Sequence, residues 1–577
     1  MQDLRLAFRL LWRSRIATSI SLLSIALTVG AVSVVFAAIK SVILDPLPYH
    51  DPERLIQFRS EFPGLRQQPN GDWVVWNDMQ EIRRRSRTLQ SIGVYGNAVF
   101  DLAGDGSSPP VALYGLRVTP DLLSTLGVTP LLGRLIQPGD DQPGRDNEML
   151  LSYGLWKTRF HSEPGIVGRS VTTNGHACLV IGVMPHDFNF PMRRQAAHTP
   201  SPYVEFWAPL VDRAPENSQA GFGAVARLRP GVSLSEAQHD LASISNTLQH
   251  DFPALNRDRV ITAALLPDRV APDASRALFL LFGAALLFLL IACSNVANLL
   301  LARTFERQRE MVIRFAIGAR RSRVVRQLLT ESIVLALAGG LAGYLLTVVA
   351  WRVLPALAPA SIPRLAAARA DWTVFCFALL LAVMNGLLFG IIPALRCSGT
   401  SLNPGLFSLK SGSTARHDYF RSALVMAEVA ISVVLVMTGG RLLDNFARLV
   451  STNPGFETNH VIASVVLPAV ERYRDPHKRA VFYQRIVDAV RALPGIEGAG
   501  TVDALPFSGE NHGGSVSAHE YIQGRHDALT AEIDVVGADY LRTMGVQLLQ
   551  GRWFRADEMS ESGDSAIIDQ RVAARLW

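Results

Sequence analysis

Five long apolar runs constrain the fold of this chain more than any other feature of its sequence. They span residues 17–39, 277–302, 328–354, 372–395 and 422–440. A helix of about 20 mostly apolar residues crosses the roughly 30 Å of hydrocarbon in a bilayer, and each run is close to that length. The sequence therefore predicts five membrane-spanning helices.

The basic residues between these runs predict how the helices are oriented. The loop at 303–326 carries eight arginines against two glutamates, whereas the next loop, 355–371, carries only two arginines. Cytoplasmic loops of membrane proteins are enriched in Arg and Lys. The basic residues behind the net charge of +6 lie beside the apolar runs, so this charge predicts contact with a lipid bilayer and no nucleic-acid partner. The segments expected on the cytoplasmic side are 1–16, 303–326 and 396–421, and those expected outside are 41–275, 355–371 and 441–577.

The segment 41–275 has the composition of a folded α+β domain. Short β-type runs such as 177–181 alternate with Pro and Gly turns. Its clearest unit is a strand at 224–228, a helix that begins with the capping box of Ser233 and Glu236, and a second strand at 260–266. We expect this unit to lead directly into the second membrane helix.

Part of the outer segment occurs twice in the chain. Nine residues recur at one constant offset, which chance explains poorly. They are Val118, Asp121, Leu123, Thr125, Gly127, Val128, Leu131, Gly133 and Arg134, matched by Val536, Asp539, Leu541, Thr543, Gly545, Val546, Leu549, Gly551 and Arg552.

The repeat predicts the overall organisation. The second copy ends where the first reaches Phe160, so we expect 441–577 to be an incomplete second outer domain. A copy of full length would add roughly 240 residues and three membrane helices. The predicted fold is a polytopic α-helical membrane protein with α+β periplasmic domains: one membrane helix, an outer domain, three membrane helices, then one helix and a partial outer domain.

Several motifs resemble those of a known family, the MacB/FtsX-like ABC transporter permeases, and within it the duplicated orphan permeases of the acidobacterial type. The resemblance covers nearly the whole chain. The segments that carry it are 45–49 (DPLPY), 126–128, 133–134, 152–156 (SYGLW), 182–185 (GVMP), 291–303, 309–311, 318–319 and 326–332.

The resemblance implies a permease in the inner (cytoplasmic) membrane of a bacterium, with MacB-like periplasmic core domains and a duplication that replaces a permease dimer by one polypeptide. Such permeases transmit ATP-driven motion from a separate ABC ATPase, expected to be a homodimer, to periplasmic domains that export or extract a substrate. A periplasmic partner is also implied. The alternative is a membrane scaffold or sensor that binds an envelope partner without substrate flux.

The loop after the second helix resembles the coupling segment of this family, which docks on the ATPase. The alternative is that its charges only fix topology and contact lipid phosphates. The residues expected to couple are Arg307, Arg309, Glu310, Arg314, Gly318, Arg320, Arg321 and Arg323.

No motif for catalysis, metal binding or nucleotide binding occurs in the sequence. It lacks GxxxxGK[ST] and HExxH, and Ser152 does not lie in a GxSxG turn. We therefore expect no enzyme activity, no metal and no cofactor on this chain, with ATP bound by the partner subunit. Polar and small residues within the apolar runs are expected to pack helices together, namely Asn295, Asn298, Gly339, Gly340 and Gly343.

Overall fold

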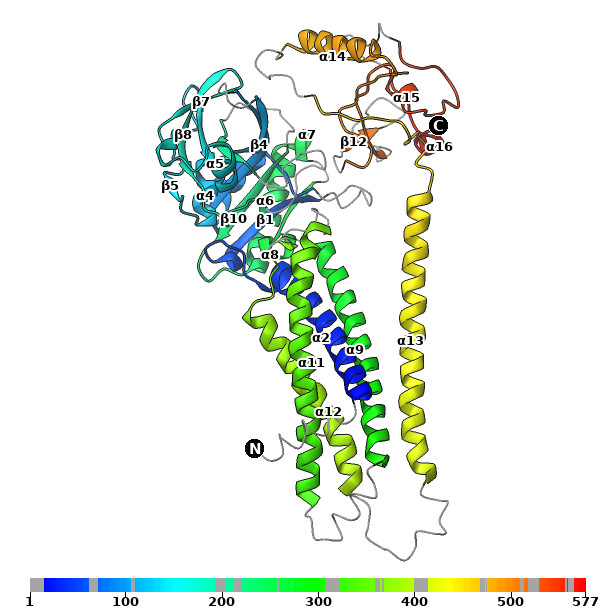
Figure 1. Cartoon of the computed structure of the whole chain (residues 1–577). Helices are drawn as coiled ribbons and strands as arrows, with labels where there is room; N and C mark the ends of the chain where they lie inside the picture. Colours follow the sequence, from blue (N-terminus) through cyan, green and yellow to red (C-terminus); the bar gives the residue numbers. More distant parts are fainter. Residues whose placement is uncertain are drawn as a thin grey trace, which may run out of the picture. The chain divides into compact units, whose positions relative to one another are not determined.

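The structure is a computed structural model of the whole chain (Figure 1). It divides into two compact units, one made of Met1–Asp45 and Ala271–Thr452, the other of Pro46–Val270 and Asn453–Trp577. The described residues are 15–61, 71–104, 109–191, 204–211, 221–256, 259–270, 272–306, 321–357, 364–365, 368–398, 414–466, 473, 475–508, 513–516, 529–555, 558 and 565–576.

The first unit consists of long helices that coincide with the apolar runs. Four stretches are long and apolar enough to cross a membrane, whereas the apolar stretch described in α12 is the shorter Trp372–Leu388. The chain is therefore a helical membrane protein with an outer domain. The elements are α2 (Arg15–Ile39), the π-helical turn η1 (Lys40–Leu44), α9 (Pro272–Glu306), α11 (Arg321–Leu357), α12 (Trp372–Ser398) and α13 (Thr414–Ser451).

Helices α2, α9, α11 and α12 pack around a common apolar core. Val29 and Val32 of α2 are fully buried in it, against residues of the other three helices such as Val296, Leu335 and Ala378. By contrast, no part of the most apolar window of α13 is buried. Three helices thus cover α2, while α13 keeps its apolar side chains exposed.

The second unit contains the sheet of the outer domain. Its helices and strands up to residue 270 are η2 (Pro52–Arg54), β1 (Leu55–Glu61), β2 (Val74–Val75), α3 (Trp76–Arg85), β3 (Leu89–Leu102), β4 (Val111–Val118), α4 (Pro120–Leu126), β5 (Leu132–Gly133), β6 (Glu148–Leu151), α5 (Tyr153–Arg159), η3 (Pro164–Ile166), β7 (Ser170–Thr173), β8 (His176–Val183), β9 (Phe206–Pro209), β10 (Gly221–Leu228), α6 (Leu234–Asp251), α7 (Pro253–Asn256), β11 (Val260–Leu265) and α8 (Leu266–Val270).

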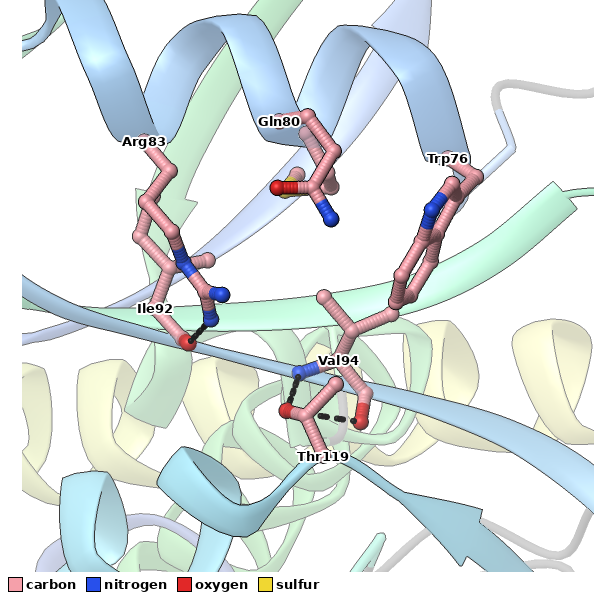
Figure 2. Close-up of a pocket in the computed structure, with 7 residues that line it drawn as sticks. Trp76, Gln80, Arg83, Ile92, Val94 and Thr119 are labelled. Atoms are coloured by element: carbon pink, nitrogen blue, oxygen red, sulfur yellow. Dashed lines mark hydrogen bonds between the residues drawn. The ribbon is translucent and has the colours of Figure 1, made fainter. Parts of the chain in front are cut away.

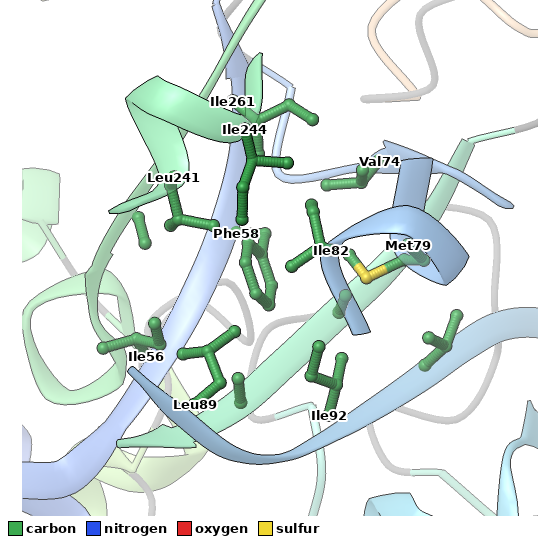
Figure 3. Close-up of a cluster of buried hydrophobic side chains, with 14 of the residues drawn as sticks. Ile56, Phe58, Val74, Met79, Ile82, Leu89, Ile92, Leu241, Ile244 and Ile261 are labelled. Carbon is green, nitrogen blue, oxygen red and sulfur yellow. The ribbon is translucent and has the colours of Figure 1, made fainter. Parts of the chain in front are cut away.

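The main path of this sheet runs β11-β1-β10-β3-β4-β9-β6-β8-β5, with β2 and β7 attached to its sides. It carries two separate apolar cores. The first lies among β1, β10, β11, α3 and α6, and Figure 3 shows Phe58 at its centre near Ile82 and Leu241. The second lies among β4, β6, β8 and α5. Strand β3 is long enough, at 14 residues, to contribute to both.

The strand-helix-strand unit predicted from the sequence is confirmed. Ser233 and Glu236 form the capping box of α6, and the apolar side of this helix is buried on the sheet. One detail was wrong: the second strand ends at Leu265, and the short helix α8 separates it from α9. Pro267 lies in the first turn of α8, where proline is favoured. This signal of a helix start was hidden by the continuous apolar run that predicted a strand.

The chain beyond residue 452 has its own elements, α14 (Pro476–Arg491), β12 (Gly513–Val516), β13 (Leu529–Glu532), α15 (Tyr540–Thr543) and α16 (Gln570–Leu576). Helices α4 and α15 both precede a glycine of positive φ, 71° at Gly127 and 64° at Gly545. The hydrogen bonds that follow also correspond, Val128 N to Leu123 O at 3.2 Å and Val546 N to Leu541 O at 3.0 Å.

A second set of contacts recurs at the same offset. Arg134 pairs with Asp140, and Arg552 pairs with Glu558. The backbone N–H groups of Gln137 and Arg555 donate to these carboxylates at 2.8 Å in each case. This stretch of the sequence repeat therefore has the same local hydrogen bonding in both places.

Candidate coupling site

Two neighbouring strands connect the outer domain to the membrane helices. Strand β1 follows α2 through η1 and η2, and β11 precedes α9 through α8. The two strands are antiparallel and in register over six residue pairs, from Ile56 opposite Leu265 to Glu61 opposite Val260. Their membrane-connected ends lie at the same end of the pair. The strand ends that lead to α2 and to α9 therefore lie side by side in the sheet.

Side chains of α6 occupy the other edge of β11. Ser245 Oγ accepts a hydrogen bond of 3.0 Å from Ile261 N, and Gln238 Nε2 donates one of 2.9 Å to Ala263 O. These groups satisfy backbone positions that a further strand would otherwise bind. The helix thus closes the edge of the sheet and holds β11 to β1.

A buried ion pair fixes the start of β11. Arg259 and Asp78 are 4% and 3% exposed, and the guanidinium donates to Asp78 and to Asn256. Burial raises the pKa of Asp78 despite the neighbouring cation, and burial lowers the pKa of Arg259. Each charge therefore depends on the other for its stability in the core.

A second buried arginine hydrogen-bonds to the segment that follows α2 in the chain. Arg227 on β10 is 6% exposed and donates to Thr125 O at 2.7 Å and to His50 O at 2.6 Å. Burial lowers the pKa of its guanidinium. Nearby, Tyr49 Oη donates to Asn189 O at 2.9 Å. The outer domain thus holds its own end of the connecting segment through both a charged and an aromatic side chain.

The three glycines of α11 singled out from the sequence lie where helices cross. A Cβ at Gly340 would lie 2.4 Å from Ala382 Cβ on α12. One at Gly339 would lie 2.6 Å from Ile25 Cγ2, and one at Gly343 would lie 2.8 Å from Ala26 O, both on α2. At these separations the neighbouring helices leave no space for a side chain.

The polar residues expected on α9 are placed differently from each other. Asn295 is exposed, whereas Asn298 is half buried and its Oδ1 accepts no hydrogen bond within the described part of the chain. Their packing role stays a prediction. Asn385 on α12, which was not predicted from the sequence, is 4% exposed and hydrogen-bonds to Cys293 and to Leu381 O. An amide side chain alone within an apolar run was the sequence signal that could have identified it as a helix-packing residue.

The predicted coupling loop falls mainly outside the described residues. Arg321 and Arg323 belong to the first turn of α11. The other six residues of the prediction, which lie outside, are Arg307, Arg309, Glu310, Arg314, Gly318 and Arg320.

The outer domain has a small cavity between α3 and β3, shown in Figure 2, where Trp76, Gln80 and Arg83 extend from α3 toward β3. Its volume of about 10 Å³ is room for a single water. Arg83 closes one side by donating to Ile92 O at 2.9 Å. Across the described ranges, no group of three or more His, Cys, Asp or Glu side chains is arranged to hold a metal ion.

Comparisons with known families match two separate stretches of the chain. Residues 18–244 match the MacB-like periplasmic core domain. Residues 282–402 match the FtsX-like permease C-terminal domain.

Curated relatives and solved structures cover parts of the chain. The macrolide export ATP-binding/permease protein MacB of Salmonella typhimurium is 27% identical over 44% of this chain and 37% of its own length. That of Campylobacter jejuni is 27% identical over 37% of this chain and 32% of its own length. The chain thus spans about a third of the length of each of these relatives.

Among solved structures, the periplasmic region of MacB from Actinobacillus actinomycetemcomitans is 12% identical, with a TM-score of 0.25 over 37% of this chain and 89% of that one. The extracellular domain of the ABC-type transporter YknZ from Gram-positive bacteria is 9% identical, with a TM-score of 0.25 over 33% and 89%.

Proposed function

Because this chain belongs to the MacB/FtsX-like permease family, we propose that it transmits ATP-driven motion from a separate ABC ATPase to its periplasmic domains. The work done there is the export or extraction of a substrate. The acidobacterial subgroup remains a prediction from the sequence.

The observation that carries this proposal is the pairing of β1 with β11. The segments that follow α2 and precede α9 lead into adjacent strands of one sheet, so relative motion of the helices would act on this six-pair ladder. Buried charged groups at both strands stabilise the ladder, because Arg259 fixes the start of β11 and Arg227 holds the segment before β1. The outer domain is therefore built to receive displacement from the membrane helices.

The proposal includes the finer layout predicted from the sequence. The N-terminus lies in the cytoplasm of a bacterial cell, the outer domains lie in the periplasm, and residues 441–577 form a partial second copy. The recurrence of the Arg134–Asp140 contact at Arg552–Glu558 supports the copy. A second copy as long as the first would supply a second coupling loop, which suits a homodimeric ATPase.

In this proposal the basic loop at 303–326 contacts the ATPase. Arginine makes directed, bidentate contacts with carboxylates, so a groove with acidic side chains would bind this loop selectively. Glu310 and Gly318 belong to the same proposed coupling loop.

The test is purification of the full-length protein from native membranes, with assay of the bound material for ATPase activity. We expect activity with the parent chain and its loss when Arg320, Arg321 and Arg323 are changed to Glu. A matched control carries the same charge change at three exposed outer positions, Arg145, Lys157 and Arg369, and should keep the activity.

Two outcomes contradict the proposal. Equal ATPase activity in all three preparations would show that the loop does not bind the enzyme. Absence of ATPase activity from every preparation, with an envelope protein bound instead, would favour the scaffold or sensor alternative.

A further inference from the structure

The end of α2 contains a single turn of π-helix. Residues Lys40–Leu44 form η1, and Asp45 N donates to Lys40 O at 2.7 Å, a spacing of five residues. Such a turn is equivalent to an α-helix with one inserted residue, and π-helical turns are rare in proteins. Contacts outside the turn are therefore expected to hold it.

One residue between α11 and α12 binds both ends of η1. Ser41 Oγ donates to Arg364 O at 2.8 Å, and Arg364 Nη1 donates to Asp45 O at 2.8 Å. Arg364 adopts a φ of 63°, which is uncommon for a residue with a side chain. In this conformation one residue reaches both ends of the turn.

A second contact joins the same turn to the start of α12. Lys40 Nζ lies 2.8 Å from Asp45 Oδ1 and 2.9 Å from Asp371 Oδ2. Asp371 also accepts a hydrogen bond of 3.1 Å from Val374 N and so caps α12. Burial acts to raise the pKa of Asp371, but hydrogen bonds from Lys40 and Val374 lower it below its usual value. The lysine is thus shared between the end of η1 and α12.

We propose that η1 can switch between a π-helical and an α-helical turn, and that Arg364 and Asp371 hold it in the π form. When these contacts open, the turn closes to α-helix and its inserted residue is absorbed. The segment that follows then turns by about 100° and moves by about 1.5 Å, the increment of one residue in an α-helix. This inference concerns conformation and holds whether or not an ATPase drives the chain.

The first experiment measures the accessibility of Val42, which is 5% exposed in the π form. A cysteine-free full chain in lipid nanodiscs carries Val42→Cys and reacts with a charged maleimide. Adding Arg364→Ala and Asp371→Asn should speed the reaction by about tenfold or more, since local opening exposes a buried thiol. Leu44→Cys, at a position 58% exposed in the protein itself, should react at the same rate in both backgrounds.

A control separates local opening from unfolding. Val180 is fully buried in the outer domain, so Val180→Cys should stay slow in both backgrounds. A rate at Val42→Cys that is unchanged by the two substitutions overturns the proposal. So does an increase at Val180→Cys as large as that at Val42→Cys.

The second experiment removes the inserted residue. Deletion of Ile43 should leave the thermal midpoint of the full chain nearly unchanged, because a π turn that loses one residue becomes α-helix. Deletion of Ala31, within the regular part of α2, shifts the buried side of the helix and should lower the midpoint by several degrees. Equal losses from the two deletions would also overturn the proposal.

Discussion

Removal of Arg259 should destabilise the outer domain by an amount that depends on pH. Arg259→Met leaves Asp78, 3% exposed, without its cation. Loss of one partner of a buried pair costs about 3–5 kcal/mol of folding free energy. Asp78 can become neutral by binding a proton, so the free energy of protonation sets an upper limit on the destabilisation that its unpaired charge causes.

That limit follows from the ordinary pKa of the carboxyl, 3.8. Each pH unit above it adds about 1.36 kcal/mol to the free energy of protonation, which gives about 4.4 kcal/mol at pH 7 and about 1.6 kcal/mol at pH 5. In the variant the pKa of Asp78 in the folded state rises further. Its folded form then binds more protons than the unfolded form, so stability increases as pH falls toward 3.8.

The measurement is hydrogen exchange of the full chain in nanodiscs, followed in peptides from α3 and β11 at pH 7 and pH 5. Rates are corrected for intrinsic exchange with the parent chain at each pH. The double variant Asp78→Asn with Arg259→Met removes both charges, so its loss of stability should be smaller than that of Arg259→Met at pH 7. Equal losses at the two pH values, or a double variant no more stable than the single one, would refute the reasoning.

Three further predictions follow from other parts of the structure. Gly340→Val should destabilise the helix bundle by about 1–3 kcal/mol, because its Cβ would overlap Ala382, whereas Gly283→Ala, with open space around it, should be neutral in the same detergent melting assay. Hydrogen bonds from Arg552 lower the pKa of Glu558 to about 2. The carboxylate of Glu558 should therefore stabilise the C-terminal region fully above about pH 4.5, and this stabilisation should be lost as pH falls toward 2. Glu558→Gln should abolish this pH dependence, measured as hydrogen exchange of the Arg555 amide. Ser245→Ala should cost about 1 kcal/mol, since Ile261 N loses its acceptor; unchanged exchange at Ile261 would contradict this.

Local patterns predicted the helices and several strands well. Ser233 and Glu236 marked the start of α6 because a capping box depends only on residues three positions apart. The apolar runs likewise located the long helices, since length and hydropathy are local properties. The family resemblance also held, because its motifs cover both matched domains.

Contacts between distant residues were not predictable from one sequence. The pairing of Ile56 with Leu265 joins positions about 200 residues apart, and no local signal specifies the partner of a strand. Arg227 stood in an apolar strand, yet nothing in its neighbourhood showed that backbone carbonyls from two other segments would surround it. Arg364 lies within a short loop in the sequence, and Asp371 lies at its end. Their contacts with η1 form only when the helices are packed together, so no local pattern indicated them.

The geometry of the β1–β11 pair determines which forces on its own strands it resists. The strand ends that lead to α2 and α9 both lie at the Ile56–Leu265 end, so forces that pull these two ends apart would break the pairs one at a time from that end. Forces directed along the two strands in opposite senses would instead load all six pairs together in shear. The pair is therefore mechanically anisotropic: it is weak against separation of its attached ends and strong against sliding of one strand along the other.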